Sequence, residues 1–109
     1  MIIMNEELAS VLRQLRAGLL ALYGDRLDRV LLYGSRARGD AALGSDVDVL
    51  VVLAGKVDAA AEIGTTEYLV ADLSLAHDLV LSCVFISVEE YHDEADLFLR
   101  NVRNDAIPV

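Results

Sequence analysis

Two aspartates and a glycine-serine pair lie in one stretch of the chain at a spacing that suits chemistry on a phosphate. Gly34-Ser35 ends one apolar run, and after ten residues Asp46 and Asp48 open another. Side chains two residues apart on a strand share a face, so these carboxylates would have Cβ atoms roughly 6.5 to 7 Å apart. Their like charges repel, and a divalent cation between them removes the penalty. Oxygen ligands of this kind favour Mg²⁺ or Mn²⁺ over zinc.

The Gly34-Ser35 pair has the chemistry of a phosphate-binding turn. A glycine after a strand lets the backbone approach a ligand closely, and a serine that starts a helix offers free N–H groups and a hydroxyl. Arg36 and Arg38 follow, and each would either contact a polyphosphate or lie in a solvated loop. A phosphate-holding turn beside metal-holding carboxylates is the minimum equipment for phosphoryl or nucleotidyl transfer.

The elements that would position these residues follow from the apolar pattern. A helix is predicted from an N-cap at Asn5 to Gly24, with a buried face made of Leu8, Val11, Leu12, Leu15, Leu19 and Leu22. Strands are predicted over 30–33, 46–53 and 79–86, and a second long helix over 57–77, with its buried stripe at Ala60, Ile63, Leu69, Leu73 and Ala76. Ser87 and Glu90 form a capping box for a short helix through Tyr91. Apolar anchors at Leu97, Phe98 and Val102 then predict a last helix to about Asn104, followed by an edge strand at 107–109.

The second strand indicates how the sheet is covered. Asp46, Asp48, Leu50 and Val52 would share one face, and Val47, Val49, Val51 and Leu53 the other. A strand that is apolar on both faces is usually covered on both sides by helices. We therefore expect an α/β or α+β domain with a small mixed sheet and helices mainly against one face.

Composition limits the classes of function. The 109 residues fit a single domain over 1–109, and the net charge of −9 argues against direct nucleic acid binding and suits solubility or a basic protein partner. Cys83 is the only cysteine, so no intrachain disulfide forms, and a buried, apolar role is expected for it. No leader or membrane span is evident, so a cytoplasmic protein without membrane contact is expected. His77 and His92 are isolated and fit surface or helix-end positions.

The pattern Gly34-Ser35, ten residues, Asp46-x-Asp48 between apolar strands resembles the signature of the DNA polymerase β nucleotidyltransferase superfamily. The short chain and the ending FLRNVRNDAI are similar to the minimal nucleotidyltransferases, which are commonly antitoxins encoded beside a helical HEPN ribonuclease toxin. The resemblance implies the polymerase β-like fold, ATP with two Mg²⁺, and transfer of AMP to a hydroxyl. It implies Asp46 and Asp48 as catalytic metal ligands and Gly34 and Ser35 as the residues that hold the triphosphate. Arg36, by its charge and position, is expected to join them as a nucleotide-binding residue.

One departure keeps several functions open. The superfamily usually has a third carboxylate on a neighbouring strand, whereas 79–86 contains no acid and the nearest candidates are Asp72, Asp78 and Glu89. The first function is an adenylyltransferase that modifies a HEPN toxin within a hetero-oligomer. The alternatives are a catalytically weak antitoxin that neutralises the toxin by binding, and a subunit of a small-molecule (antibiotic) nucleotidyltransferase. The choice of ATP over other nucleoside triphosphates and the acceptor's identity are open. Glycosyltransferases also use Asp-x-Asp but need a much larger domain.

Overall fold

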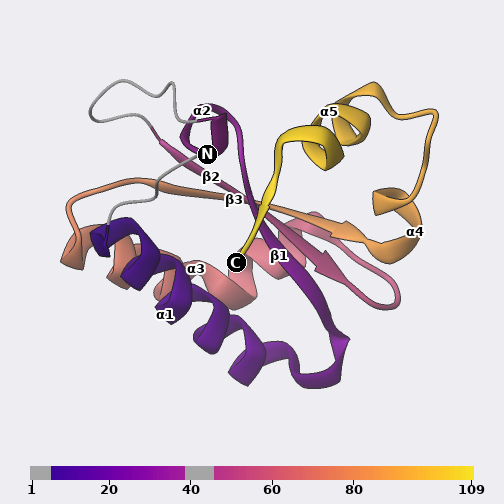
Figure 1. Ribbon diagram of the computed structural model, residues 1–109. Coiled ribbons are helices and arrows are strands. Elements are labelled where there is room, and N and C mark those ends of the chain that lie inside the picture. The colour runs from indigo at the N-terminus through magenta and orange to yellow at the C-terminus, as the bar shows by residue number, and fades with distance from the viewer. Residues whose placement is uncertain (1–5, 39–45) are drawn as a thin grey trace.

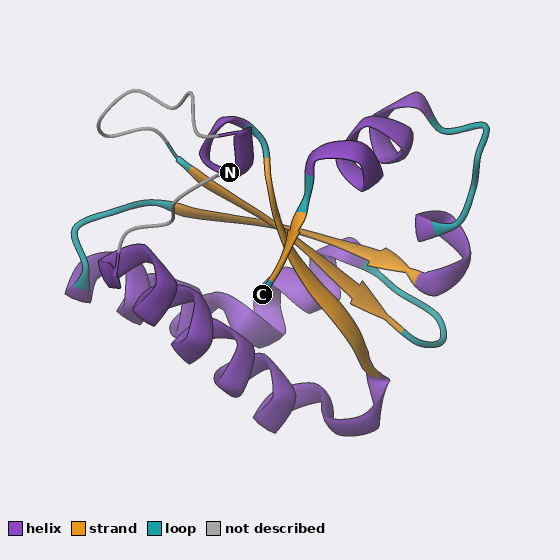
Figure 2. Ribbon diagram, viewed as in Figure 1, coloured by secondary structure: helices purple, strands orange, loops and turns teal. Residues whose placement is uncertain are grey.

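A four-stranded mixed sheet lies between helices on both of its faces (Figures 1 and 2). The structure, a computed structural model, describes residues 6–38 and 46–109. Strand β1 runs antiparallel to β2 and β4, while β2 and β3 are parallel, in the spatial order β3-β2-β1-β4. The elements are α1 Glu6–Tyr23, a 3-10 turn Gly24–Arg26, β1 Leu27–Tyr33, α2 Ser35–Arg38, β2 Val47–Leu53, α3 Ala59–Ala76, β3 Leu81–Ser87, α4 Val88–Tyr91, α5 Leu97–Asp105 and β4 Ile107–Pro108.

The two long helices, α1 and α3, pack side by side on one face of the sheet (Figure 1). The odd-numbered residues of β2 face them, as do Val30 and Leu32 of β1. Helix α1 ends before Gly24, whose φ of +56° is rarely adopted by other residues. The predicted helix end is therefore confirmed, and the predicted N-cap, Asn5, lies outside the described residues. Leu22 is 48% exposed rather than buried, because Tyr23 packs against this core in the last turn.

Helix α3 corrects the predicted buried stripe. Its buried residues are Glu62, Thr66 and Leu73, while Ile63 is 55% exposed and Ala60 and Ala76 are exposed. The polar side chains are buried because both have partners: the Thr66 hydroxyl donates to the Glu62 carbonyl at 2.9 Å, and the Glu62 carboxylate accepts from the Tyr23 hydroxyl and the Asp58 N–H. The predicted Leu73 is buried and Leu69 is partly buried against the core, whereas apolar periodicity misses the polar Glu62 and Thr66.

The opposite face of the sheet is covered by the shorter α4 and α5. Leu50 and Val52 of β2 pack there against Tyr91 of α4 and Leu99 and Val102 of α5. The alternation predicted for β2 is therefore confirmed, and the long helices do lie on one face as expected. The Ser87–Glu90 capping box is present, with both reciprocal hydrogen bonds. The predicted anchor Leu97 is 70% exposed and Phe98 is 48% exposed, because the inward positions of α5 belong to Leu99 and Val102.

Strands β1 and β2 begin at residues other than those predicted. Strand β1 begins at Leu27, three residues earlier than predicted, and β2 begins at Val47, directly after Asp46. His77 and His92 are the C-caps of α3 and α4. Cys83 is half-buried, and burial raises the pKa of its thiol to about 11. Among the described residues, no helix is long and apolar enough to span a membrane.

Candidate functional site

Gly34 and Asp48 meet at one end of the sheet, where β1 ends and β2 begins. Tyr33 is the register partner of Asp48 across the antiparallel pair, so the next residue, Gly34, passes beside the aspartate. Gly34 has a φ of +77°, and a Cβ built on it would lie 2.5 Å from Oδ2 of Asp48. A side chain would be strained at this φ, and its Cβ would force the Asp48 carboxylate to shift. The backbone of the predicted turn thus lies against one predicted metal ligand.

The turn passes directly into α2. The Gly34 carbonyl accepts from the N–H groups of Ala37 and Arg38 at 3.1 and 3.2 Å, which begins the helix at Ser35 as predicted. Ala37 is fully buried in the core shared with α1 and fixes the turn in place. The Ser35 hydroxyl and the first N–H groups of α2 therefore belong to the same short segment that touches Asp48.

The charges at this edge repel each other, as the strand pattern predicts. Asp48 is half-buried and the preceding Asp46 is exposed. Burial, together with the negative charge of Asp46, raises the pKa of Asp48 above its usual value. Burial and the charge of Asp48 likewise raise the pKa of Tyr33. A cation bound at the two carboxylates would offset this repulsion.

A magnesium ion fits this donor set. Mg²⁺ is typically held by one or two protein carboxylates together with substrate phosphates and water. Within residues 6–38 and 46–109, no group of three or more His, Cys, Asp or Glu side chains is placed to hold a metal by itself. Asp46 and Asp48 therefore suit a metal that arrives with a phosphorylated ligand better than a permanent structural ion.

Among residues 6–38 and 46–109, the structure brings no third acid together with Asp46 and Asp48 as a metal-holding group. The residue beside Asp48 on the parallel strand β3 is Ser82. Asp72 is exposed on α3, a helix of the opposite face, and Glu89 follows the far end of β3. Asp78 lies in the turn before β3, exposed and with a φ of +51°. On β3, the register position beside Asp48 is therefore occupied by a serine rather than an acid.

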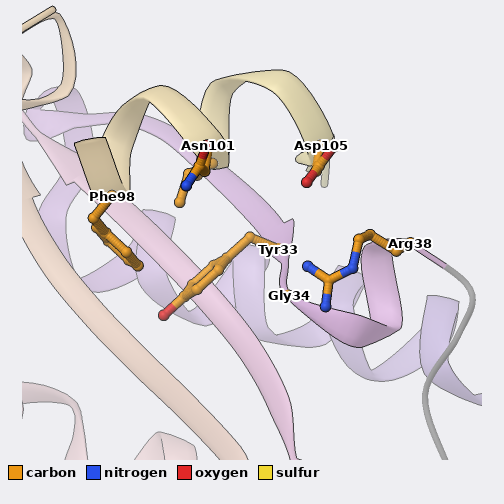
Figure 3. A pocket seen from close by; sticks show the side chains of 7 residues that line it. Tyr33, Gly34, Arg38, Phe98, Asn101 and Asp105 are labelled. Atoms are coloured by element: carbon orange, nitrogen blue, oxygen red, sulfur yellow. The ribbon is translucent and has the colours of Figure 1, made fainter. Parts of the chain in front are cut away.

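A cavity of about 230 Å³ opens next to Gly34 (Figure 3). Its wall combines the end of β1, Arg38 of α2 and one stripe of α5, formed by Phe98, Asn101, Val102 and Asp105. Arg36, predicted to bind nucleotide, is half-buried and does not line the cavity, whereas Arg38 does. Asn101 and Asp105 were not predicted, although the spacing of the stripe, i, i+3, i+4, i+7, marks one helical face.

A nucleotidyltransferase domain is the class that this fold and this site define. The family described as nucleotidyltransferase domain matches residues 12–107, and the chain belongs to that family. The chain is also 40% identical over 47 residues to a protein of Methanocaldococcus jannaschii named as a putative protein adenylyltransferase. That match covers 43% of this chain and 48% of the relative, so about half of the relative's length is matched.

Solved structures show the same fold. A toxin–antitoxin complex determined with AMP-PNP superposes with a TM-score of 0.62 at 19% identity, covering 95% of this chain and 72% of the other. A MntA–HpeT toxin–antitoxin structure gives 0.58 at 19% identity, with 96% and 72% covered. A putative nucleotidyltransferase of Sulfolobus solfataricus gives 0.52 at 22% identity, with 99% and 89% covered. The polymerase β-like fold expected from the sequence is confirmed.

Proposed function

We propose that the protein transfers AMP from ATP to a hydroxyl of a partner protein. The observation that supports this most directly is the contact of Gly34 with Asp48, because the glycine-serine turn and one of the two carboxylates lie together at the end of the sheet. The sequence match to a protein named as an adenylyltransferase favours AMP as the group transferred. The AMP-PNP in one structural neighbour favours an adenine nucleotide as substrate.

In the proposed reaction the acceptor oxygen attacks the α-phosphorus of ATP. A new P–O bond forms, the bond to the β-phosphate breaks, and pyrophosphate leaves while the hydroxyl proton passes to solvent or a nearby base. Ser35 and the Gly34 backbone would hold the leaving pyrophosphate, and Arg36 or Arg38 would offset its charge. Asp46 and Asp48 would hold two Mg²⁺, which supply charge neutralisation at the phosphates.

The proposed acceptor is a HEPN-type toxin that adenylylation silences, which would make this protein its antitoxin. The toxin–antitoxin complexes among the structural neighbours support this class of partner. The net charge of −9 suits association with a basic protein. The partner surface would supply the acceptor hydroxyl, in a hetero-oligomer.

The test uses the purified protein, the toxin encoded beside it and ATP labelled on the α-phosphate. We expect the toxin to become labelled with Mg²⁺ present and labelling to disappear in Asp46→Asn/Asp48→Asn. The matched control, Glu67→Gln/Asp72→Asn, removes the same charge from exposed positions of α3 and should label normally. Labelling that survives the first pair of changes would refute the site assignment.

A second candidate function is neutralisation by binding alone, and Ser82 is the observation that favours it. The register partner of Asp48 on β3 is this serine rather than an acid, and a site without an acid there would activate the acceptor weakly. Toxin activity measured without ATP separates the two functions, since equal suppression by the wild type and by Asp46→Asn/Asp48→Asn would identify occlusion. If the serine limits turnover, Ser82→Asp should raise the labelling rate. Labelling of aminoglycosides in place of the toxin would instead support a small-molecule transferase.

A further inference from the structure

We propose that the cavity between β1, α2 and α5 binds the nucleoside of the nucleotide, with Phe98 and Asn101 of α5 contacting the base. This inference rests on the proposed function, since it assigns the nucleotide's base a place beside the turn that would hold its phosphates. The cavity borders Gly34, and the carboxylate of Asp48 lies against the same glycine without lining the cavity itself. A ligand with phosphates at Asp46 and Asp48 can reach it without crossing the sheet.

The aromatic wall of the cavity suits a flat heterocycle. Tyr33 and Phe98 meet edge to face, with centroids 5.7 Å apart and ring planes at 86°. Phe98 is 48% exposed although its neighbours Leu99 and Val102 are buried, so a large apolar ring remains open to solvent. Figure 3 shows the Phe98 and Tyr33 rings beside each other. Any nucleic acid base can stack on an aromatic ring of this kind, because every base has a π-face. A volume of about 230 Å³ suits a base better than a whole nucleotide.

The polar residues of the cavity match the polar groups of a nucleoside. Asn101 carries an amide, which can donate and accept at once, as asparagine does at the N6 and N7 positions of adenine. Asp105, one helical turn further along the same face of α5, carries a carboxylate of the type that accepts hydrogen bonds from ribose hydroxyls. Figure 3 shows both side chains descending from α5 on the cavity side.

The geometry favours the nucleotide over the acceptor hydroxyl as occupant. Attacking and leaving oxygens lie roughly in line across the reacting phosphorus. The cavity adjoins Gly34 at the end of β1, whereas Ser82 lies on β3, across β2 from that end. If the Gly34 turn holds the leaving pyrophosphate, the acceptor has to approach from the side of β3. A phosphate is the poorer fit, because the wall contains the apolar side chains of Tyr33, Phe98 and Val102.

The experiment compares two ligands in calorimetric titrations with Mg²⁺: an ATP analogue with a methylene between the α- and β-phosphorus, and inorganic tripolyphosphate. Phe98→Ala and Asn101→Ala should each weaken the ATP analogue by about 5- to 150-fold, the range for loss of one base contact, and leave tripolyphosphate binding unchanged. Asp48→Asn should weaken both ligands. Leu97→Ala and Asn104→Ala, exposed on the same helix and outside the cavity, are the matched controls and should bind as wild type.

Each outcome decides one of the two proposals. If Phe98→Ala and Asn101→Ala bind the ATP analogue as wild type does, the cavity does not hold the base. That result would leave the proposal of AMP transfer standing. If they weaken only the ATP analogue while the wild type labels no acceptor, the base site stands and the proposed transfer fails. If the wild-type protein binds neither ligand, both proposals fall.

Discussion

Gly34 couples backbone conformation to the chemistry of the site. Its φ of +77° lets the chain turn from β1 into α2, and its missing side chain makes room for Oδ2 of Asp48. A sequence motif of glycine and serine thus has a physical cause, because the turn and the aspartate occupy adjoining space. Through this contact, the conformation of Gly34 and the position of the Asp48 carboxylate depend on each other, although the two residues are separated in the chain.

Gly34→Ala should destabilise the fold and weaken nucleotide binding. The new methyl group would lie 2.5 Å from the Asp48 carboxylate at a strained φ, which costs about 1–3 kcal/mol. Gly64→Ala is the control, because nothing lies within 4 Å of a Cβ there and the change within α3 should stabilise by up to about 1 kcal/mol. Urea denaturation and ATP titration measure both effects. Unchanged stability in Gly34→Ala would contradict the contact.

Asp48→Asn should stabilise the metal-free protein at neutral pH while removing metal binding. Burial and Asp46 raise the pKa of Asp48, so its ionised form is disfavoured in the folded state. Stability is therefore lost as pH rises through the raised folded pKa, and the loss is fully present at neutral pH. The asparagine lacks this loss, so its advantage in unfolding temperature, measured in EDTA, should shrink on acidification. Adding Mg²⁺ should stabilise only the wild type, and a lower unfolding temperature for the variant in EDTA would refute the repulsion.

Local sequence patterns were sufficient to predict the faces of β2 and two of the helix ends. The alternation in β2 placed Asp48 on the face of Leu50 and Val52, and the glycine after α1 and the capping box before α4 marked real helix ends. Each of these depends on a few neighbouring residues, so the sequence carries the information.

Tertiary partners were what the sequence could not provide. Glu62 and Thr66 are buried on α3 because Tyr23 and backbone groups satisfy their hydrogen bonds. The spacing of apolar residues cannot indicate that polar side chains are buried. The cavity needs Tyr33 and Phe98, which are far apart in the sequence, to meet when α5 packs on the sheet. Helical spacing identifies the stripe on α5 but not the strand end that completes the cavity.

A hydrogen bond between Tyr23 and Glu62 joins α1 to α3. The Tyr23 hydroxyl donates to Glu62 at 3.3 Å, and burial, followed by the charge of Glu62, raises the pKa of Tyr23 to about 12. At neutral pH Tyr23→Phe should lower the free energy of unfolding by about 1 kcal/mol, the usual contribution of one hydrogen bond. Between pH 10 and about 12 the unfolded phenol ionises while the folded one does not, so wild-type stability falls there.

Urea denaturation of both proteins at pH 7 and pH 11 measures this effect. The wild-type advantage over Tyr23→Phe should be smaller at pH 11. The difference between the two proteins isolates Tyr23, because Tyr33, whose pKa is also raised, is present in both. A wild-type advantage that stays constant or grows with pH would refute the assignment.

The larger apolar core and the candidate binding site lie on opposite faces of one sheet. Helices α1 and α3 cover one face, which holds the larger apolar core, and α5 covers the other (Figure 1). Asp48 and the cavity belong to the face of α5. Since every strand contributes alternate side chains to both faces, the core residues of β2 also hold the aspartate in register. Stability and binding should therefore separate when the two helical layers are changed one at a time.

Leu73→Ala and Leu99→Ala make the same chemical change on opposite faces. Leu73 of α3 is 8% exposed and Leu99 of α5 is 3% exposed, so each truncation should lower the free energy of unfolding by about 2–5 kcal/mol. Only Leu99→Ala loosens the helix that carries Phe98 and Asn101, so only it should also weaken binding of the ATP analogue when both are titrated well below their unfolding midpoints. Tripolyphosphate binding should be unchanged in both, because Gly34 and Asp48 depend on β1 and β2. Equal weakening by the two variants would mean that the cavity depends on overall stability rather than on the position of α5.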